Sequence, residues 1–182
     1  MALGCGAIVC VPATFCGART LAISLRAPHR LQPKRASLTQ ALAKEVDEAA
    51  TRLPPSRIED AIDLALGITS SKLRFGLDHT TSMRFDRAVR EGHCVEYAQL
   101  FVSVLDRIAR SATLRVTTWP VRSDAHALGR SLPWRAWRDH DWVLVADPVS
   151  KERWFVDPSF HDMGLGWDVE ANVIGKGALP AA

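Results

Sequence analysis

Apolar residues recur every three or four positions in the first half of the chain, which is the spacing of a helix face packed on a core. Residues 37–53 and 56–66 both follow this spacing, and each segment starts with a serine three residues before Gln40 or Glu59. That arrangement is typical of an N-terminal capping box. Two prolines separate the segments, since proline cannot continue a helix. The pattern predicts two consecutive helices, and a further short helical piece is expected at residues 86–90.

The clearest helical pattern spans residues 92–110. Valines broaden its apolar side, so most of this helix is expected to be buried. Glu96 and Gln99 belong to the polar stripe, although Glu96 is also a candidate to support a site around the cysteine two residues before it. The apolar stripe returns at intervals of four, three, four and three residues, at Cys94, Ala98, Phe101, Leu105 and Ile108. Cys94 therefore stands in the first turn, at the head of the buried face.

A strand pattern replaces the helical one after this helix. Residues 113–121 are rich in β-branched side chains and predict a strand that ends at a turn near Ser123. Residues 140–146 and 153–157 predict a hairpin, because turn residues that include Pro148 separate them. Helices followed by strands indicate an α+β domain.

The hairpin brings two polar residues together. A turn centred between Pro148 and Val149 places His140 directly opposite Asp157, with Cβ atoms about 5 Å apart. A carboxylate at that distance can orient an imidazole ring. A shift of one residue in this register would separate the two side chains.

Composition narrows the class of protein. The chain has 182 residues, of which 47% are hydrophobic and 24% charged, enough for one compact domain with short extensions. Its 23 basic and 20 acidic side chains give a net charge of +3, which argues against nucleic acid as the main partner. The four cysteines lack the spacing of a zinc module or a disulfide framework. We therefore expect no metal and no cofactor.

The first eighteen residues carry no charged side chain and contain three of the four cysteines. Basic residues follow this apolar segment instead of preceding it, which is the reverse of a signal peptide and favours retention in the cytoplasm. Export or membrane tethering through the leader is the alternative. We divide the chain into a leader and linker (residues 1–36), one domain (residues 37–163) and a tail (residues 164–182).

Cysteine, histidine and aspartate in this order predict nucleophilic chemistry. A thiol at a helix N-terminus feels the positive end of the helix dipole, which favours the thiolate of Cys94. An adjacent His140 would stabilise that thiolate and carry protons, while Asp157 would hold its ring. The backbone N–H of Cys94 is available to an oxyanion. Candidate side-chain donors to the oxyanion are His79, Thr80 and Thr81.

Three short motifs resemble those of the transglutaminase-like superfamily. GHCVEYA at residues 92–98 resembles its nucleophile motif, HDW at residues 140–142 its His-Ala-Trp strand, and WFVDPS at residues 154–159 its Trp-x-x-Asp-Pro-Thr strand end. The resemblance covers residues 56–160. It departs from the family at Asp141, where a small residue is usual, and in the long tryptophan-containing loop before the histidine.

The resemblance implies a papain-like fold in which the nucleophile helix packs on a small antiparallel sheet. It assigns Cys94 as nucleophile, His140 as base and Asp157 as orienting acid. The implied reaction is attack on the amide of a protein or peptide, followed by transfer of the acyl group to water or an amine. Hydrolysis is favoured, because nothing in the sequence marks an amine site.

Other interpretations of the same residues stay open. A binding module could retain the fold without catalysis, and would then need neither an activated Cys94 nor His140. Residues 90–94, with sequence REGHC, also partly resemble the Arg-Gly-Gly-x-Cys motif of arylamine acetyltransferases. Trp134 and Trp137 either pack in the core or line a substrate groove.

Overall fold

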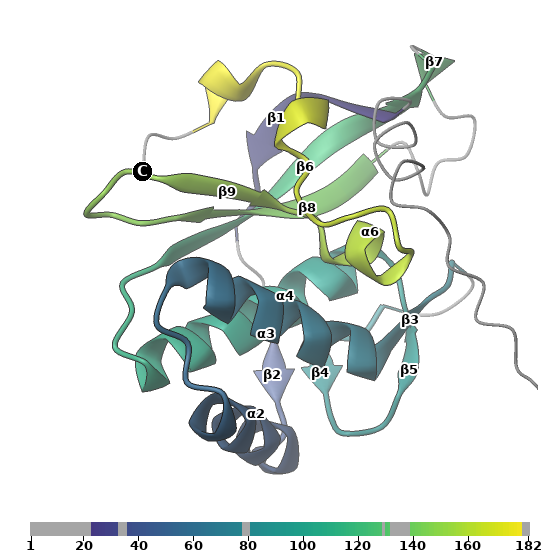
Figure 1. The fold of residues 1–182 in the computed structure, drawn as a ribbon. Helices are drawn as coiled ribbons and strands as arrows, with labels where there is room; N and C mark the ends of the chain where they lie inside the picture. The colour runs from purple at the N-terminus through teal and green to yellow at the C-terminus, as the bar shows by residue number, and fades with distance from the viewer. Residues whose placement is uncertain (1–22, 33–35, 78–80, 129, 132–138, 180–182) are drawn as a thin grey trace, which may run out of the picture.

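The computed structural model describes residues 23–32, 36–77, 81–128, 130–131 and 139–179. Several residues named above lie outside this part of the chain. These are the apolar leader, His79, Thr80, and the loop that holds Trp134 and Trp137. The described residues form one mixed α+β arrangement in which helices cover an antiparallel sheet (Figure 1). The coarse fold class expected from the sequence is therefore confirmed.

Three helices form one layer, below the sheet in Figure 1: α2 (Gln40–Arg52), α3 (Ile58–Lys72) and α4 (Cys94–Ser111). All three were predicted, but the caps of the first two differ from expectation. Thr39 caps α2, because Ser37 is used in a short strand. At the start of α3, Asp60 accepts hydrogen bonds from the backbone N–H groups of Ser56 and Arg57.

The main sheet is antiparallel and its long strands follow the order β1 (Ile23–Arg30), β6 (Thr117–Ala127), β8 (Asp139–Ala146), β9 (Arg153–Val156). A short strand, β7 (Arg130–Ser131), also pairs with β6. The turn expected near Ser123 is wrong, because β6 continues to Ala127 and pairs with β1 on one side and β8 on the other. A strand whose backbone is satisfied on both sides outweighs the turn preference of single residues.

Two small parallel pairs lead the chain into α4. Strand β2 (Ser37–Leu38) pairs with β4 (Arg84–Phe85), and β3 (Leu73–Phe75) pairs with β5 (Arg90–Gly92). The short helix expected at residues 86–90 is therefore wrong. Gly92 allows a close approach where β5 meets α4, because a Cβ there would lie 3.0 Å from a methyl group of Leu73.

The sheet has an apolar core on each face. Along β8, Val143 and Val145 pack with the helices, whereas Trp142 and Leu144 face the opposite side. That second side is covered by the C-terminal segment, coloured yellow at the top of Figure 1. It contains two short 3-10 helices, η1 (Glu170–Asn172) and η2 (Lys176–Ala178), whereas α6 (Pro158–Asp162) lies beside α3 and α4 and contributes Phe160 to the second core.

The ends of the described chain belong to this second core. Val169, Val173 and Leu179 are buried in it, together with Leu25 of β1. The packed structure thus extends into the segments expected to be linker and tail, since β1 falls before residue 37 and η2 after residue 164. Sequence periodicity missed both, because each contributes only a few buried side chains.

The β8–β9 hairpin has a longer loop than expected. Its closing hydrogen bond runs from the Asp147 N–H to the Glu152 carbonyl, and Lys151 adopts a left-handed conformation with φ of 68°. The observed register pairs Val143 with Val156, which is two residues from the predicted one. Because side chains alternate with a period of two, this even shift leaves His140 and Asp157 on the same face of the sheet.

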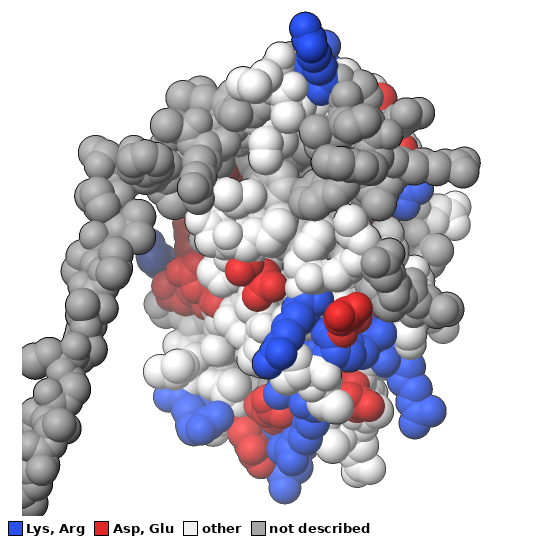
Figure 2. Space-filling view, turned by 90° about the vertical axis from the view of Figure 1, so that its right-hand side faces the viewer, with Lys and Arg blue, Asp and Glu red and all other residues white. Residues whose placement is uncertain are grey.

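Charges of both signs lie side by side in the lower half of the face shown in Figure 2. Within the described part of the chain, no helix is both long and apolar enough to cross a membrane.

We expect Val145→Ala to lower the free energy of unfolding by about 2 kcal/mol, because the valine is fully buried between the sheet and the helices. Val149→Ala is the matched control, since the same side chain is 68% exposed in the β8–β9 loop. Urea unfolding measures both changes. Equal losses in the two variants would contradict the observed packing.

Candidate active site

Cys94 is the first residue of α4 and its side chain is buried, with 5% exposure. Its thiol lies beside the start of β8, where Sγ is 3.8 Å from the carbonyl oxygen of Asp139, one residue before His140. Cys94 forms no disulfide. As the first helical residue, it has a backbone N–H with no partner within the helix.

His93 is the N-cap of α4. Its Nδ1 accepts a hydrogen bond from the Val95 N–H at 3.3 Å, and its Nε2 lies 2.9 Å from the hydroxyl of Thr81. A second imidazole is thus held next to Cys94. Hydrogen bonding with Cys94 raises the pKa of His93, and burial partly opposes that rise. The negative charge on Cys94 raises the pKa of His93 further. Thr81, one of the candidate oxyanion donors, contacts the ring of His93 and therefore lies at the N-terminus of α4.

Glu96 is fully buried, in contrast to the surface position that its place in the polar stripe predicts. Its carboxylate accepts hydrogen bonds from the backbone N–H groups of His93 and Ser82, at 3.2 and 3.0 Å, and pairs with Arg90 at 3.3 Å. Arg90 also donates to the Ser82 carbonyl oxygen at 2.7 Å. These contacts fasten the segment before α4 to its first turn, which fixes the position of Cys94. Gln99 is buried as well, with 3% exposure.

His140 and Asp157 form the centre of the site. Nε2 of His140 is 2.5 Å from Oδ2 of Asp157, and both side chains are buried. The other carboxylate oxygen caps α6, where it accepts the backbone N–H groups of Ser159 and Phe160 and the Ser159 hydroxyl. Phe160 stacks on the imidazole with ring centroids 4.8 Å apart. Pro158 at the start of α6 supports this cap, because its fixed φ suits a first helical residue.

The electrostatics of this group favour an ionised thiol. Burial lowers the pKa of His140, but the charge and hydrogen bond of Asp157, together with Cys94, raise it well above its ordinary value. Burial raises the pKa of Cys94, and its interactions with His140 and His93 lower it by more, to about 7. Because Nε2 of His140 is used by Asp157, Nδ1 is the ring nitrogen left for the thiol. Near neutral pH the arrangement supports a thiolate beside an imidazolium.

The structure therefore brings together all three residues selected from the sequence, Cys94, His140 and Asp157. The pairing of His140 with Asp157 is diagonal rather than directly opposite, as the hairpin register requires. The cluster thus contains a thiol, an imidazole and a carboxylate, the three groups that cysteine-based nucleophilic catalysis uses. No group of three metal-ligating side chains occurs among the residues that the structure describes.

An ion pair next to this cluster was missed from the sequence. The carboxylate of Asp141, only 1% exposed, accepts two hydrogen bonds from Arg122, at 2.7 Å from Nε and 3.1 Å from Nη2. The charge of Asp141 works against ionisation of Cys94 and is among the causes that raise its pKa. The sequence did contain a clue to this ion pair. Asp141 follows His140 at a position where the transglutaminase-like motif usually has a small residue.

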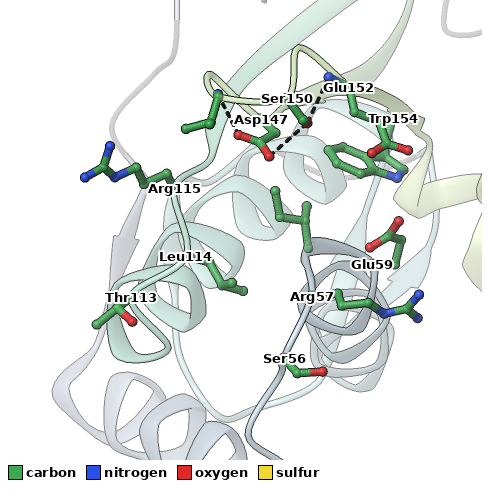
Figure 3. A pocket seen from close by; sticks show the side chains of 12 residues that line it. Ser56, Arg57, Glu59, Thr113, Leu114, Arg115, Asp147, Ser150, Glu152 and Trp154 are labelled. Carbon is green, nitrogen blue, oxygen red and sulfur yellow. Dashed lines mark hydrogen bonds between the residues drawn. The ribbon is translucent and has the colours of Figure 1, made fainter.

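A pocket of about 530 Å³ lies at the other end of α4 (Figure 3). Thr113, Leu114 and Arg115 line it from the segment after the helix, and Trp154 lines it from β9. Asp147, at its rim, is bound to its own turn through Val149 and Ser150. None of the residues that line this pocket belongs to the cluster around Cys94.

No known protein-family model matches this chain, and neither a curated protein nor a solved structure matches it significantly.

We expect Glu96→Ala to lower the free energy of unfolding by about 3 kcal/mol, because it leaves Arg90 and two backbone N–H groups without their buried partner. Glu48→Ala is the control, since Glu48 pairs with Lys44 on the surface and its loss should cost less than about 0.5 kcal/mol. Chemical unfolding of both variants tests this. A loss at Glu96 as small as that at Glu48 would contradict the anchoring role.

Proposed function

We propose that this chain is a transglutaminase-like cysteine enzyme of papain-like fold that hydrolyses amides of proteins or peptides through Cys94, His140 and Asp157. The observation that carries the proposal is the buried hydrogen bond between His140 and Asp157 beside a thiol at a helix N-terminus. Three motif resemblances point in the same direction. The proposed steps use side chains of this chain alone and no cofactor.

In the first step, the thiolate of Cys94 attacks the carbonyl carbon of the amide. A carbon–sulfur bond forms and the carbonyl electron pair moves to oxygen, next to the backbone N–H of Cys94. When the carbonyl re-forms, the carbon–nitrogen bond breaks, and the His140 imidazolium gives its proton to the leaving amine. The products of this step are a free amine, a thioester on Cys94 and a neutral imidazole.

In the second step, His140 takes a proton from water while the water oxygen attacks the thioester carbon. The carbon–sulfur bond then breaks, and Cys94 leaves as the thiolate beside the newly formed imidazolium. The acyl group departs as a carboxylic acid. Asp157 holds the ring through Nε2 in both steps. An amine in place of water would give acyl transfer by the same sequence, and we propose water as the principal acceptor.

Alkylation of Cys94 by iodoacetamide tests the ion pair. A pKa of about 7 means that the rate rises with pH and reaches half of its plateau near neutrality. His140→Ala removes the larger of the two histidine interactions that lower the pKa but keeps the burial and His93, so the pKa should rise and the rate at pH 7 should fall several-fold. Peptide mass spectrometry separates Cys94 from the other cysteines.

His29→Ala is the control for this experiment, because His29 is an exposed histidine of β1, and β6 lies between β1 and the strand that holds His140. It should leave the pH profile unchanged. A Cys94 that titrates with an ordinary thiol pKa in the unaltered protein, with no effect of His140→Ala, would favour the binding module over the enzyme.

Acetylation by p-nitrophenyl acetate tests the proposed thioester without knowledge of the substrate. The protein should release p-nitrophenolate in a burst and carry one acetyl group on Cys94, and Cys94→Ser should abolish both. Asp157→Asn keeps an oxygen for the α6 cap but removes the charge facing His140, so acetylation should slow by roughly tenfold to a hundredfold.

Asp147→Asn is the matched control, since Asp147 also accepts hydrogen bonds from its own turn but lies outside the cluster. Its acetylation rate should equal that of the unaltered protein. A burst that persists in Cys94→Ser, or acetyl groups found only on lysines, would overturn the thioester mechanism.

A further inference from the structure

Two hydrogen bonds to Asp141 hold the guanidinium of Arg122 in place. The Arg122 side chain is 33% exposed, whereas the Asp141 side chain that binds it is 1% exposed. Arg122 belongs to β6 and Asp141 to β8, and the two residues are directly opposite each other in this pair of strands. The carboxylate is thus behind the guanidinium, and a solute approaching from solvent meets the cation first.

Arg122 lies close to the reacting thiol. Sγ of Cys94 is 3.8 Å from the carbonyl oxygen of Asp139, two residues before the Asp141 that holds Arg122. The next pair along the ladder, Ser123 with His140, places the imidazole on the opposite face of the sheet, against Phe160. By strand alternation, Asp141 shares with Val143 the side of the sheet covered by α4. The hydrogen bond to Asp141 raises the pKa of Arg122, and burial of the side chain partly opposes that rise. The negative charges of Asp141, Asp139 and Cys94 raise the pKa of Arg122 further. The guanidinium and the thiolate therefore interact electrostatically.

The guanidinium has donors left for a ligand. Of its five N–H bonds, the two contacts with Asp141 use one on Nε and one on Nη2, so five minus two leaves three. They lie in one plane, a geometry that matches a carboxylate. The Arg122 side chain is 33% exposed, so these remaining donors are the part of the ion pair that a solute can reach.

We propose that Arg122 is a specificity residue that binds a carboxylate of the substrate, and that Asp141 positions it. The substrate class is an acidic peptide, in which a carboxylate lies within a few bonds of the carbonyl that Cys94 attacks. This inference rests on the proposed function, because it assigns the recognition of a substrate at the same thiol.

Two alkylating reagents measure the effect without a known substrate. Iodoacetate and iodoacetamide undergo the same reaction, in which the sulfur of Cys94 displaces iodide from carbon, but only iodoacetate carries a carboxylate on that carbon. The ratio of their rate constants therefore reports how the site treats an anion. In Arg122→Gln/Asp141→Asn, we expect this ratio to fall about fivefold, the size of an exposed charge interaction of about 1 kcal/mol.

A second ion pair supplies a matched control. Arg107 binds Asp47 through the same two nitrogens, at 2.6 Å each, and is 35% exposed, but it joins α4 to α2 away from Cys94. Arg107→Gln/Asp47→Asn removes the same charges and should leave the ratio unchanged. Arg122→Met/Asp141→Leu guards against a folding defect, because apolar side chains often replace an ion pair without loss of stability.

A ratio that stays at the unaltered value in both Arg122 variants would overturn the specificity role. A fall of the same size in the Arg107 variant would also overturn it, because the effect would then be general. Failure of the proposed function is a separate result: iodoacetamide would then show an ordinary thiol pKa. The ratio can still be measured at a pH where any thiol is ionised, so the two outcomes are distinguishable.

Discussion

The buried carboxylate of Asp157 is the group on which the arrangement around Cys94 depends. A carboxylate without solvent needs partners for both oxygens, and Asp157 has them: one oxygen caps α6, and the other binds His140. The cap fixes where the C-terminal segment leaves the sheet and brings Phe160 against the imidazole. One buried charge therefore couples the end of β9, the orientation of His140 and the packing of the second core.

A second buried carboxylate has the corresponding role on the other side of the thiol. Glu96 joins the first turn of α4 to Ser82 and Arg90, so the segment that precedes Cys94 cannot move independently of the helix. The thiol is thus held between two polar networks, one local to α4 and one formed across β8 and β9. Asp141 adds a third carboxylate, whose charge opposes the thiolate while its partner Arg122 faces solvent. Each of the three carboxylates near Cys94 consequently has a basic partner: Arg90, Arg122 or His140.

Predictions from the sequence succeeded where one periodic pattern dominates. The apolar stripe of α4 and the two strands of the β8–β9 hairpin were found, and His140 and Asp157 followed from them. The predicted register of the β8–β9 hairpin was wrong by two residues. Turn preferences do not specify the length of a loop, and the observed loop includes Lys151 instead of turning tightly at Pro148. Ser123 was assigned to a turn for a similar reason, since its position in β6 depends on pairing with two distant strands.

The sequence by itself determined the three candidate residues and the elements that present them: Cys94 at a helix start, and His140 and Asp157 at one end of a hairpin. Helical and strand periodicity are local properties, so they can be recognised within a few residues. Only the tertiary structure decided that Glu96 is buried, that Asp141 binds Arg122, and that the C-terminal segment covers the sheet. Those features depend on which surfaces meet in three dimensions, and a buried charge gives no local signal of the partner that compensates it.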